Sequence, residues 1–329
     1  MENIFNVVLL VALPASGKSE VRNFLSHLPA QRLRDEFHIG ESLQLDDFPY
    51  VHMMRRIDEE LCAMGRERIF YPGEAPFLDG RDWGTLCCLL NEGYHDLINR
   101  NICRPDFASQ LLFDRIDRAA AQAGLPHRLG SLPQSVRSRL AQSLEAEARA
   151  MLDAKHAAYP QSFAGKTIVI ECARGGPDGA SMPLSDTFGY QYSLPMFCPE
   201  ILKNAALLYI WVTPEESRRK NNDRADPNDP GSNLHHGVPE AVMLGDYGCD
   251  DMAYLISLSA GADAISVNRQ GQSYSLPVGV FDNRVDKTSF LRDPPESWDA
   301  AKLAEVGDAI KKATDTMYKN YHPEGDEGI

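Results

Sequence analysis

The fold of this chain is decided near its N-terminus by the stretch VVLLVALPASGKS, which runs from Val7 to Ser19. Phe5–Ala12 is a short apolar run of the kind that forms a buried strand. Small residues follow it and favour a turn, and Glu20–Leu28 has the pattern of a helix that opens at Gly17-Lys18-Ser19. A strand that leads through a short turn into a helix begins a βαβ unit, so this stretch predicts an α/β fold.

The turn has the spacing A-x-x-x-x-G-K-S, which is that of a phosphate-binding P-loop with alanine in place of the first glycine. In such a loop successive backbone N–H groups close around the β-phosphate, and the helix N-terminus adds positive potential. The lysine reaches the β- and γ-phosphates and the serine hydroxyl ligates Mg²⁺. The predicted ATP-binding residues are Pro14, Ala15, Ser16, Gly17, Lys18 and Ser19, with Lys18 also catalytic and Ser19 also a metal ligand.

Ala12 occupies the position of the motif's first glycine. Alanine fits there only with a negative φ, so the chain must leave the strand in a conformation that accepts a Cβ. The alternative interpretation of the whole stretch is an ordinary strand–turn–helix that binds no phosphate.

Further apolar, β-rich runs predict the other strands of a mostly parallel sheet. They are Thr167–Glu171, Leu207–Val212 and Val278–Phe281, with Ser42–Leu45 as a weaker candidate. Helical patterns separate these runs, as expected of βαβ units. The predicted fold class is therefore α/β of the P-loop NTPase type, a mostly parallel sheet flanked by helices.

A large helical insertion is predicted between the strands Ser42–Leu45 and Thr167–Glu171. Phe107–Ala123 and Ser135–Tyr159 have helical patterns, and the second is filled with good helix formers. We expect this region to lie over the carboxyl edge of the sheet, and a separate all-helical domain is the alternative. Near the C-terminus a last helix, roughly Ser297–Tyr321, follows a break at Pro294-Pro295. The predicted division is a nucleotide-binding core of residues 1–47 and 166–293, the insertion 48–165, and a C-terminal helix and tail, 294–329.

Composition limits the possible partners. Of 329 residues, 33 are Lys or Arg and 47 are Asp or Glu, which gives a net charge of −14. So acidic a chain argues against general nucleic-acid binding and against a membrane surface.

The seven cysteines lack CxxC spacing and no HExxH occurs, so neither a disulfide framework nor a zinc site is expected. No segment resembles a membrane span or a secretion signal, and we expect a cytoplasmic protein.

Acidic residues stand at the ends of two predicted strands. Asp46 and Asp47 follow Ser42–Leu45, and Glu171 ends the next strong strand. Ligands of doubly wound sheets bind beyond the carboxyl ends of the strands, and Mg²⁺ with its water would compensate for buried carboxylates there. The alternative for Asp46-Asp47 is a helix N-cap.

These motifs resemble the P-loop small-molecule kinases of the uridine kinase and phosphoribulokinase group. The likeness rests on Ala15-Ser16-Gly17-Lys18-Ser19, on Asp46-Asp47-Phe48, and on an apolar strand that ends in Ile170-Glu171. It implies that Asp46 or Asp47 acts near the acceptor hydroxyl or the metal, and that Glu171 lies beside Mg²⁺. It covers the sheet core only, and Cys172 stands where these kinases usually have glycine.

A basic cluster, Arg218, Arg219, Lys220 and Arg224, follows Pro214 at the start of another predicted helix. The same kinases have such arginines before a lid that closes over the phosphates, which implies catalytic roles for Arg219 and Arg224 and a lid at the turn-rich residues 225–233. A solvated basic face is the alternative. The resemblance also implies that Asn283, after the last core strand, borders the adenine.

The sequence thus predicts an ATP- and Mg²⁺-dependent kinase that acts on the hydroxyl of a small-molecule acceptor. A nucleotide-binding switch with little turnover, or a kinase that acts on a macromolecular end, are the alternatives. The sequence names neither the acceptor nor the oligomeric state.

Overall fold

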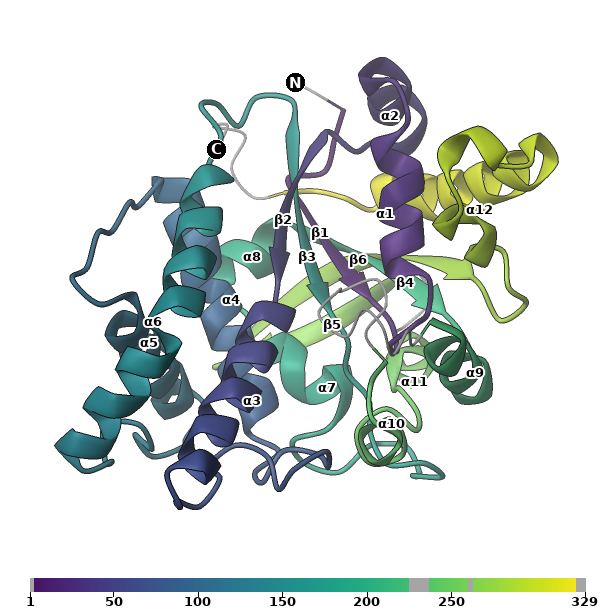
Figure 1. Cartoon of the computed structure of the whole chain (residues 1–329). Coiled ribbons are helices and arrows are strands. Elements are labelled where there is room, and N and C mark those ends of the chain that lie inside the picture. Colours follow the sequence, from purple (N-terminus) through teal and green to yellow (C-terminus); the bar gives the residue numbers. More distant parts are fainter. Residues whose placement is uncertain (1–2, 225–236, 260–262, 324–329) are drawn as a thin grey trace.

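Six strands form one sheet in the order β2-β3-β1-β4-β6-β5 (Figure 1). The computed structural model describes residues 3–224, 237–259 and 263–323. All neighbouring strands are parallel except β5 and β6, which form an antiparallel pair. The strands are β1 Val7–Val11, β2 Glu41–Asp46, β3 Lys166–Cys172, β4 Ala205–Trp211, β5 Ala264–Arg269 and β6 Gln272–Asp282.

The five predicted strands are all present, and the mostly parallel α/β sheet is confirmed. The sequence prediction missed β5, which pairs with the first half of β6. A two-residue turn joins these two strands, with φ of 49° at Gln270 and 83° at Gly271. A type I′ hairpin turn requires two positive φ values. The strand β5, which the sequence prediction lacked, is therefore explained by the local turn.

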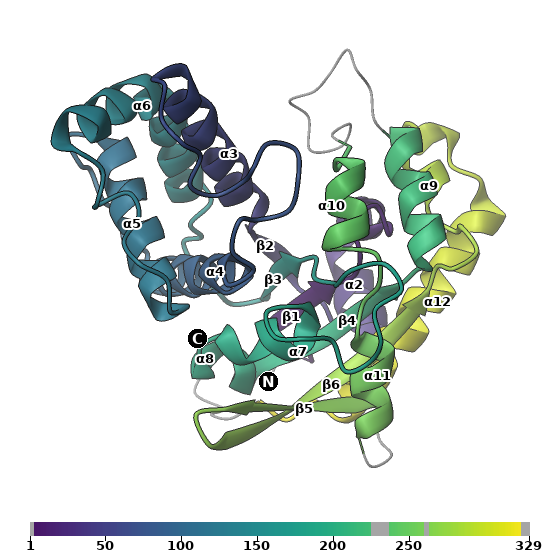
Figure 2. The same ribbon diagram turned by 90° about the horizontal axis from the view of Figure 1, so that it is seen from below.

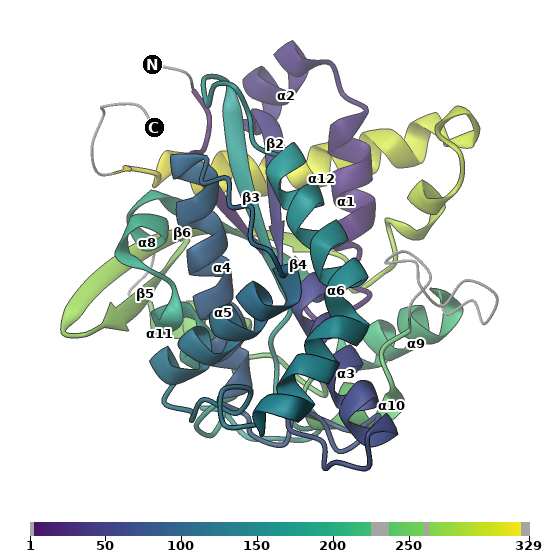
Figure 3. The same cartoon turned by 60° about the vertical axis from the view of Figure 1, so that its left-hand side comes forward.

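Helices cover both faces of the sheet (Figures 1 and 3). In β1, Val7, Leu9 and Val11 face one core, while Val8 and Leu10 face the other. This alternation of buried residues on both sides is the reason a central parallel strand is apolar throughout. One face is covered by α1 (Lys18–Ser26), α2 (Ala30–Phe37) and α12 (Ala300–Lys319), and the other by α4 (Asp82–Asn99), α7 (Gly189–Ser193), α8 (Pro199–Asn204) and α11 (Met252–Leu258).

Four long helices lie between β2 and β3 in the chain and form a lobe beside the sheet (Figure 2). They are α3 (Phe48–Ala63), α4, α5 (Ala108–Gln122) and α6 (Gln134–Ala157). The two helices predicted in this region correspond to α5 and α6. One face of α4 packs into the core of this lobe through Leu86 and Leu89, and another packs on the sheet through Leu90 and Leu97. The lobe and the sheet therefore share a helix.

The remaining short elements follow β3, β4 and β6 in the chain. They are η1 (Leu194–Met196), α9 (Pro214–Arg224), α10 (Glu240–Gly245), η2 (Ser289–Arg292) and η3 (Pro295–Ser297). The predicted C-terminal helix is α12, and Asp299 caps it by accepting hydrogen bonds from the backbone of Ala301 and Lys302. All seven cysteines are free. Within the described residues, no helix combines the length and apolar character that a membrane span needs.

Candidate functional site

The loop between β1 and α1 turns sharply twice. Ala12 is buried and is not among the residues with positive φ, as its place in the motif requires. The positive values fall on Ala15, with φ 53°, and on Gly17, with φ 108°. A Cβ at Gly17 would also lie 2.6 Å from Thr288 Oγ1 and 2.9 Å from Asn283 Nδ2. Glycine is therefore needed at position 17 both for its backbone freedom and for space.

Two side chains from later parts of the chain hold this loop in place. Asn283 donates from Nδ2 to the Ser16 carbonyl at 2.7 Å, and Ser217 donates from Oγ to the Pro14 carbonyl at 2.7 Å. Asn283 itself is fully buried, and its Oδ1 accepts from the Lys287 amide. Its amide supports the loop from beneath and does not line the cavity described below, so a contact between Asn283 and adenine stays a prediction.

Tyr190 joins the ends of β1 and β3. Its buried hydroxyl accepts a hydrogen bond from the Ala12 amide at 2.8 Å. The same oxygen lies 3.0 Å from the Ala12 carbonyl and 3.2 Å from the Cys172 carbonyl, to one of which it donates. The Tyr190 hydroxyl therefore holds the backbone at Ala12, where the chain leaves β1. The sequence analysis did not predict this role.

The N-terminus of α1 opens onto the same region. Gly17 is its N-cap, and no side chain of the described residues caps the helix. Lys18 Nζ lies 3.5 Å from the Leu13 carbonyl, so the lysine curls back along the loop. The Ser16 hydroxyl is buried, and within the described part of the chain it has no hydrogen-bond partner. A buried polar atom of this kind points to a polar ligand, because an unsatisfied buried hydroxyl is costly.

The predicted carboxylates do meet at the carboxyl edge of the sheet. Asp46 at the end of β2 pairs in register with Glu171 of β3. Glu171 forms an ion pair with Arg22 of α1 and accepts from Gln44 Nε2 at 3.3 Å. Arg22 lies four residues after Lys18, on the same helical face, so spacing alone could have indicated it.

Asp46 and Asp47 have different surroundings. Burial, with the neighbouring charges of Asp47 and Glu171, raises the pKa of Asp46 to about 7, although Phe48 donates its amide to the carboxylate at 2.8 Å. Asp47 instead forms an ion pair of 2.7 Å with Arg174. A charge partner favours the ionised form of a carboxyl, whereas burial beside like charges favours the protonated form. Asp46 is thus the carboxyl suited to exchange a proton near neutral pH.

Arg174 is one of the largest fully buried side chains of the protein. Besides Asp47 it contacts the Ala173 carbonyl at 2.6 Å, and its guanidinium lies over the Trp83 ring at 4.9 Å. Nη2 also lies 3.5 Å from Cys87 Sγ. The sequence contains no local signal for this role, because the partners of Arg174 come from the start of α3 and from α4.

These groups surround one cavity of about 400 Å³, a volume in the range of small-molecule sites. One end is formed by the loop, Lys18, Ser19 and the three carboxylates. The other end is mostly apolar and aromatic and lies between the helical lobe and α10. Its lining residues are Phe48, Val51, Arg55, Tyr71, Trp83, Val238, Pro239, Val242, Asp246 and Tyr247.

Asp246 is the buried acid of this second end. Its side chain is 4% exposed, and burial raises its pKa to about 7, against the opposing charge of Arg55. Arg55 lies over the Tyr71 ring at 4.0 Å and donates to the Gly73 carbonyl. A carboxyl and a guanidinium among aromatic rings can orient a polar group on an otherwise apolar ligand.

Arg218, Arg219 and Lys220 of the basic cluster do not line this cavity. Arg219 is 50% exposed and forms ion pairs with Glu216 and Asp223 of its own helix. This is the arrangement expected of a solvated basic face, and Arg219 does not line the cavity. Arg224 ends α9, and its side chain and the predicted lid, 225–233, lie outside the described residues. A catalytic role for either arginine stays a prediction.

No family model, no curated protein and no solved structure matches this chain. What the chain does is therefore argued from the site itself.

Proposed function

We propose that this protein is a Mg²⁺-dependent phosphotransferase of the P-loop NTPase type, which transfers the γ-phosphate of ATP to a hydroxyl of a small molecule. One observation carries the proposal. One cavity is lined at one end by Lys18 and Ser19 of the loop with three carboxylates, and at the other by a mostly apolar and aromatic surface. Phosphoryl transfer needs both of these, since its catalysis is mainly positioning and electrostatics.

The residues of the first end fit a nucleotide and its metal. Among the described residues the buried Ser16 hydroxyl has no hydrogen-bond partner, and the N-terminus of α1 favours anions. Lys18 would contact the phosphates, while Ser19 and Glu171 would hold Mg²⁺, with Arg22 adding positive charge beside Glu171. When bound, MgATP supplies the phosphoryl group and the metal charge that offsets its oxygens.

The two aspartates have separate tasks in this proposal. Asp46 accepts the proton of the acceptor hydroxyl, because its raised pKa of about 7 lets it exchange protons near neutral pH. Asp47 forms an ion pair with Arg174 and fixes the chain where β2 leads into α3. The apolar end holds the body of the acceptor and excludes water, which strengthens the electrostatic interactions inside.

The test is acceptor-dependent release of ADP by the full chain, screened with nucleosides, sugars and vitamins. Lys18→Ala should lower turnover by at least about 100-fold, the scale of losing one preorganised charged donor. Lys311→Ala, on the exposed side of α12, is the matched control and should leave turnover unchanged. A Lys18→Ala turnover within a few-fold of wild type would contradict the proposal.

Asp46→Asn separates a kinase from a nucleotide-binding switch. A kinase should lose turnover in this variant and keep its affinity for ATP, since only the proton acceptor is removed. A wild-type protein that binds ATP but releases no ADP with any acceptor would favour the switch. If Asp46→Asn stays fully active on an accepted substrate, Asp46 is not the base.

A further inference from the structure

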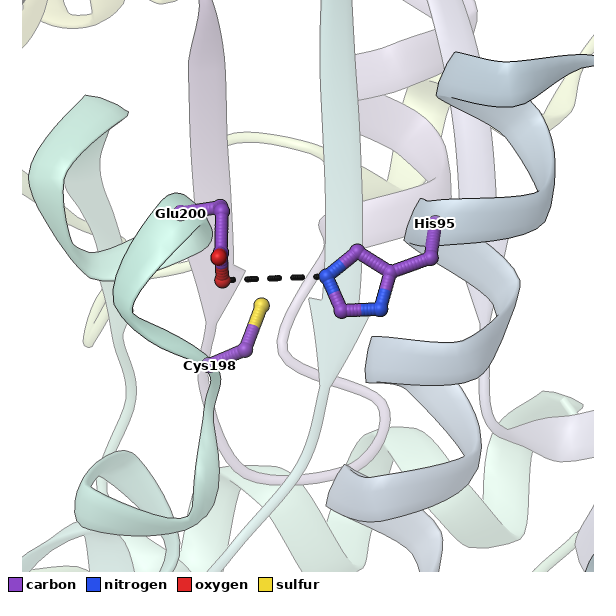
Figure 4. A group of neighbouring side chains, drawn as sticks. All are labelled: His95, Cys198 and Glu200. Carbon is purple, nitrogen blue, oxygen red and sulfur yellow. Dashed lines mark ion pairs between the residues drawn. The ribbon is translucent and has the colours of Figure 1, made fainter.

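A second group of chemically reactive side chains lies outside the cavity. His95 of α4, Cys198 just before α8, and Glu200 in the first turn of α8 direct their side chains toward one point (Figure 4). One nitrogen, one sulfur and one oxygen from these residues all lie within 4.8 Å of one another. The His95 Nε2 and Glu200 Oε2 atoms are 3.7 Å apart.

These separations are close to those of three ligands on one metal ion. Zinc binds sulfur at about 2.3 Å and nitrogen or oxygen at about 2.0–2.2 Å, so tetrahedral ligand atoms lie about 3.3–3.8 Å from one another. The His95–Glu200 separation already falls in this range. The Cys198 sulfur lies within 4.8 Å of both of these atoms.

A neighbouring residue fixes the two elements against each other. Asn91, one helical turn before His95, donates from Nδ2 to the Met196 carbonyl at 2.8 Å and accepts from the Cys198 amide at 2.9 Å. Cys198 is buried, whereas the His95 and Glu200 side chains are about half exposed. The thiol is therefore held in place beneath two ligands that solvent can reach, which leaves an entry path for an ion.

The group is remote from the cavity. Trp83 lines the cavity in the first turn of α4, and His95 lies 12 residues further along that helix, about 18 Å at 1.5 Å per residue. Cys198 and Glu200 precede the amino end of β4, whereas the loop follows the carboxyl end of β1. A ligand here would act on the packing of α4 against α8 and not on the cavity directly.

We propose that His95, Cys198 and Glu200 bind one zinc-class transition-metal ion, with water as the fourth ligand. The thiol and imidazole are the reason for this class, because Mg²⁺ and Ca²⁺ prefer oxygen ligands alone. Three protein ligands with one open position is a known zinc arrangement. The ion joins α4 to α8. It thereby stabilises the packing of these two helices on one face of the sheet.

Metal binding must displace the thiol proton. A cysteine thiol is ordinarily protonated at neutral pH, whereas the metal ligand is the thiolate. When sulfur binds the ion, that proton goes to solvent and the thiolate electron pair forms the metal–sulfur bond. The site should therefore bind metal more tightly as the pH rises.

The experiment is titration of the reduced, full-length protein with Co²⁺ as a spectroscopic substitute for Zn²⁺. We expect one ion per chain with a thiolate-to-cobalt charge-transfer band, which Zn²⁺ abolishes by displacement. His95→Gln should weaken binding by at least about 100-fold, more than the 10–100-fold typical of losing an outer-sphere partner. Zn²⁺ should raise the Tm of the wild type and leave that of His95→Gln unchanged.

Two controls guard against other thiols and against misfolding. Cys103→Ser removes an exposed cysteine and should keep the band, whereas Cys198→Ser should lose it. Glu200→Gln keeps the helix start and tests the site without altering the buried thiol. Absence of the charge-transfer band in the wild type, or a band that persists in both His95→Gln and Cys198→Ser, would overturn the proposal.

Discussion

Asp46→Asn should stabilise the fold in a way that depends on pH. The pKa of Asp46 is raised from 3.8 to about 7, mainly by burial and then by the charges of Asp47 and Glu171. In the unfolded chain this carboxyl ionises near pH 4, but in the folded protein it holds its proton to about pH 7. Between these values the folded state binds more protons, so the stability of the wild type falls as the pH rises.

The size of the effect follows from the shift. Slightly more than three pKa units at about 1.4 kcal/mol each set an upper value of about 4 kcal/mol above pH 7. Because Asp46 retains partial contact with solvent, which screens its charge, we expect about half of this, ~2 kcal/mol. Asparagine resembles the protonated acid, so the variant should gain this stability at pH 8 and almost none at pH 4.

The assay is urea denaturation of both proteins from pH 4 to pH 8, without nucleotide or Mg²⁺. Other buried acids titrate in both proteins, so the difference between the two curves isolates Asp46. Asp153→Asn, at an exposed position of α6, is the matched control for the change of side chain. An equal difference in unfolding free energy at pH 4 and pH 8 would refute the assignment of a raised pKa to Asp46.

Three further changes test the supports of the site. Gly17→Ala places a Cβ against Thr288 at a φ of 108°, so we expect a loss of at least about 2 kcal/mol in denaturation, and a loss below 0.5 kcal/mol would contradict the geometry. Arg174→Met leaves Asp47 buried and unpaired and should cost about 3–5 kcal/mol, part of which Asp47→Asn should restore in the double variant. Tyr190→Phe removes the hydroxyl that joins β1 to β3 and should cost about 1–3 kcal/mol by the same assay, with an unchanged denaturation midpoint as the contrary result.

Some features of the site lay within reach of sequence reasoning but were not predicted. Arg22 follows Lys18 by one helical turn, a spacing that places both on one face. The hairpin of β5 and β6 has alternating buried residues on both sides of Gln270-Gly271. Both signals are local, and both were available in the chain.

Other features had no local signal. Arg174 pairs with Asp47, the N-cap residue of α3, and contacts Cys87 in α4, and Asp246 lines the cavity just after α10. His95 and Cys198 are 103 positions apart in the sequence, so no motif spacing predicts that their side chains lie close together. Such groups come together only through tertiary contacts, so neither composition nor local motifs predict them.

The sequence by itself determined the sheet and the loop. Apolar β-rich runs, the small residues before Gly17-Lys18-Ser19, and acids at the ends of β2 and β3 act locally, and parallel strands bring their carboxyl ends to one edge. Only the tertiary structure decided that Asp46 holds its proton to about pH 7. Asp46 and Asp47 are adjacent in the sequence, but one is buried beside like charges while the other lies 2.7 Å from Arg174. The difference is electrostatic, and it depends on partners that folding alone brings close.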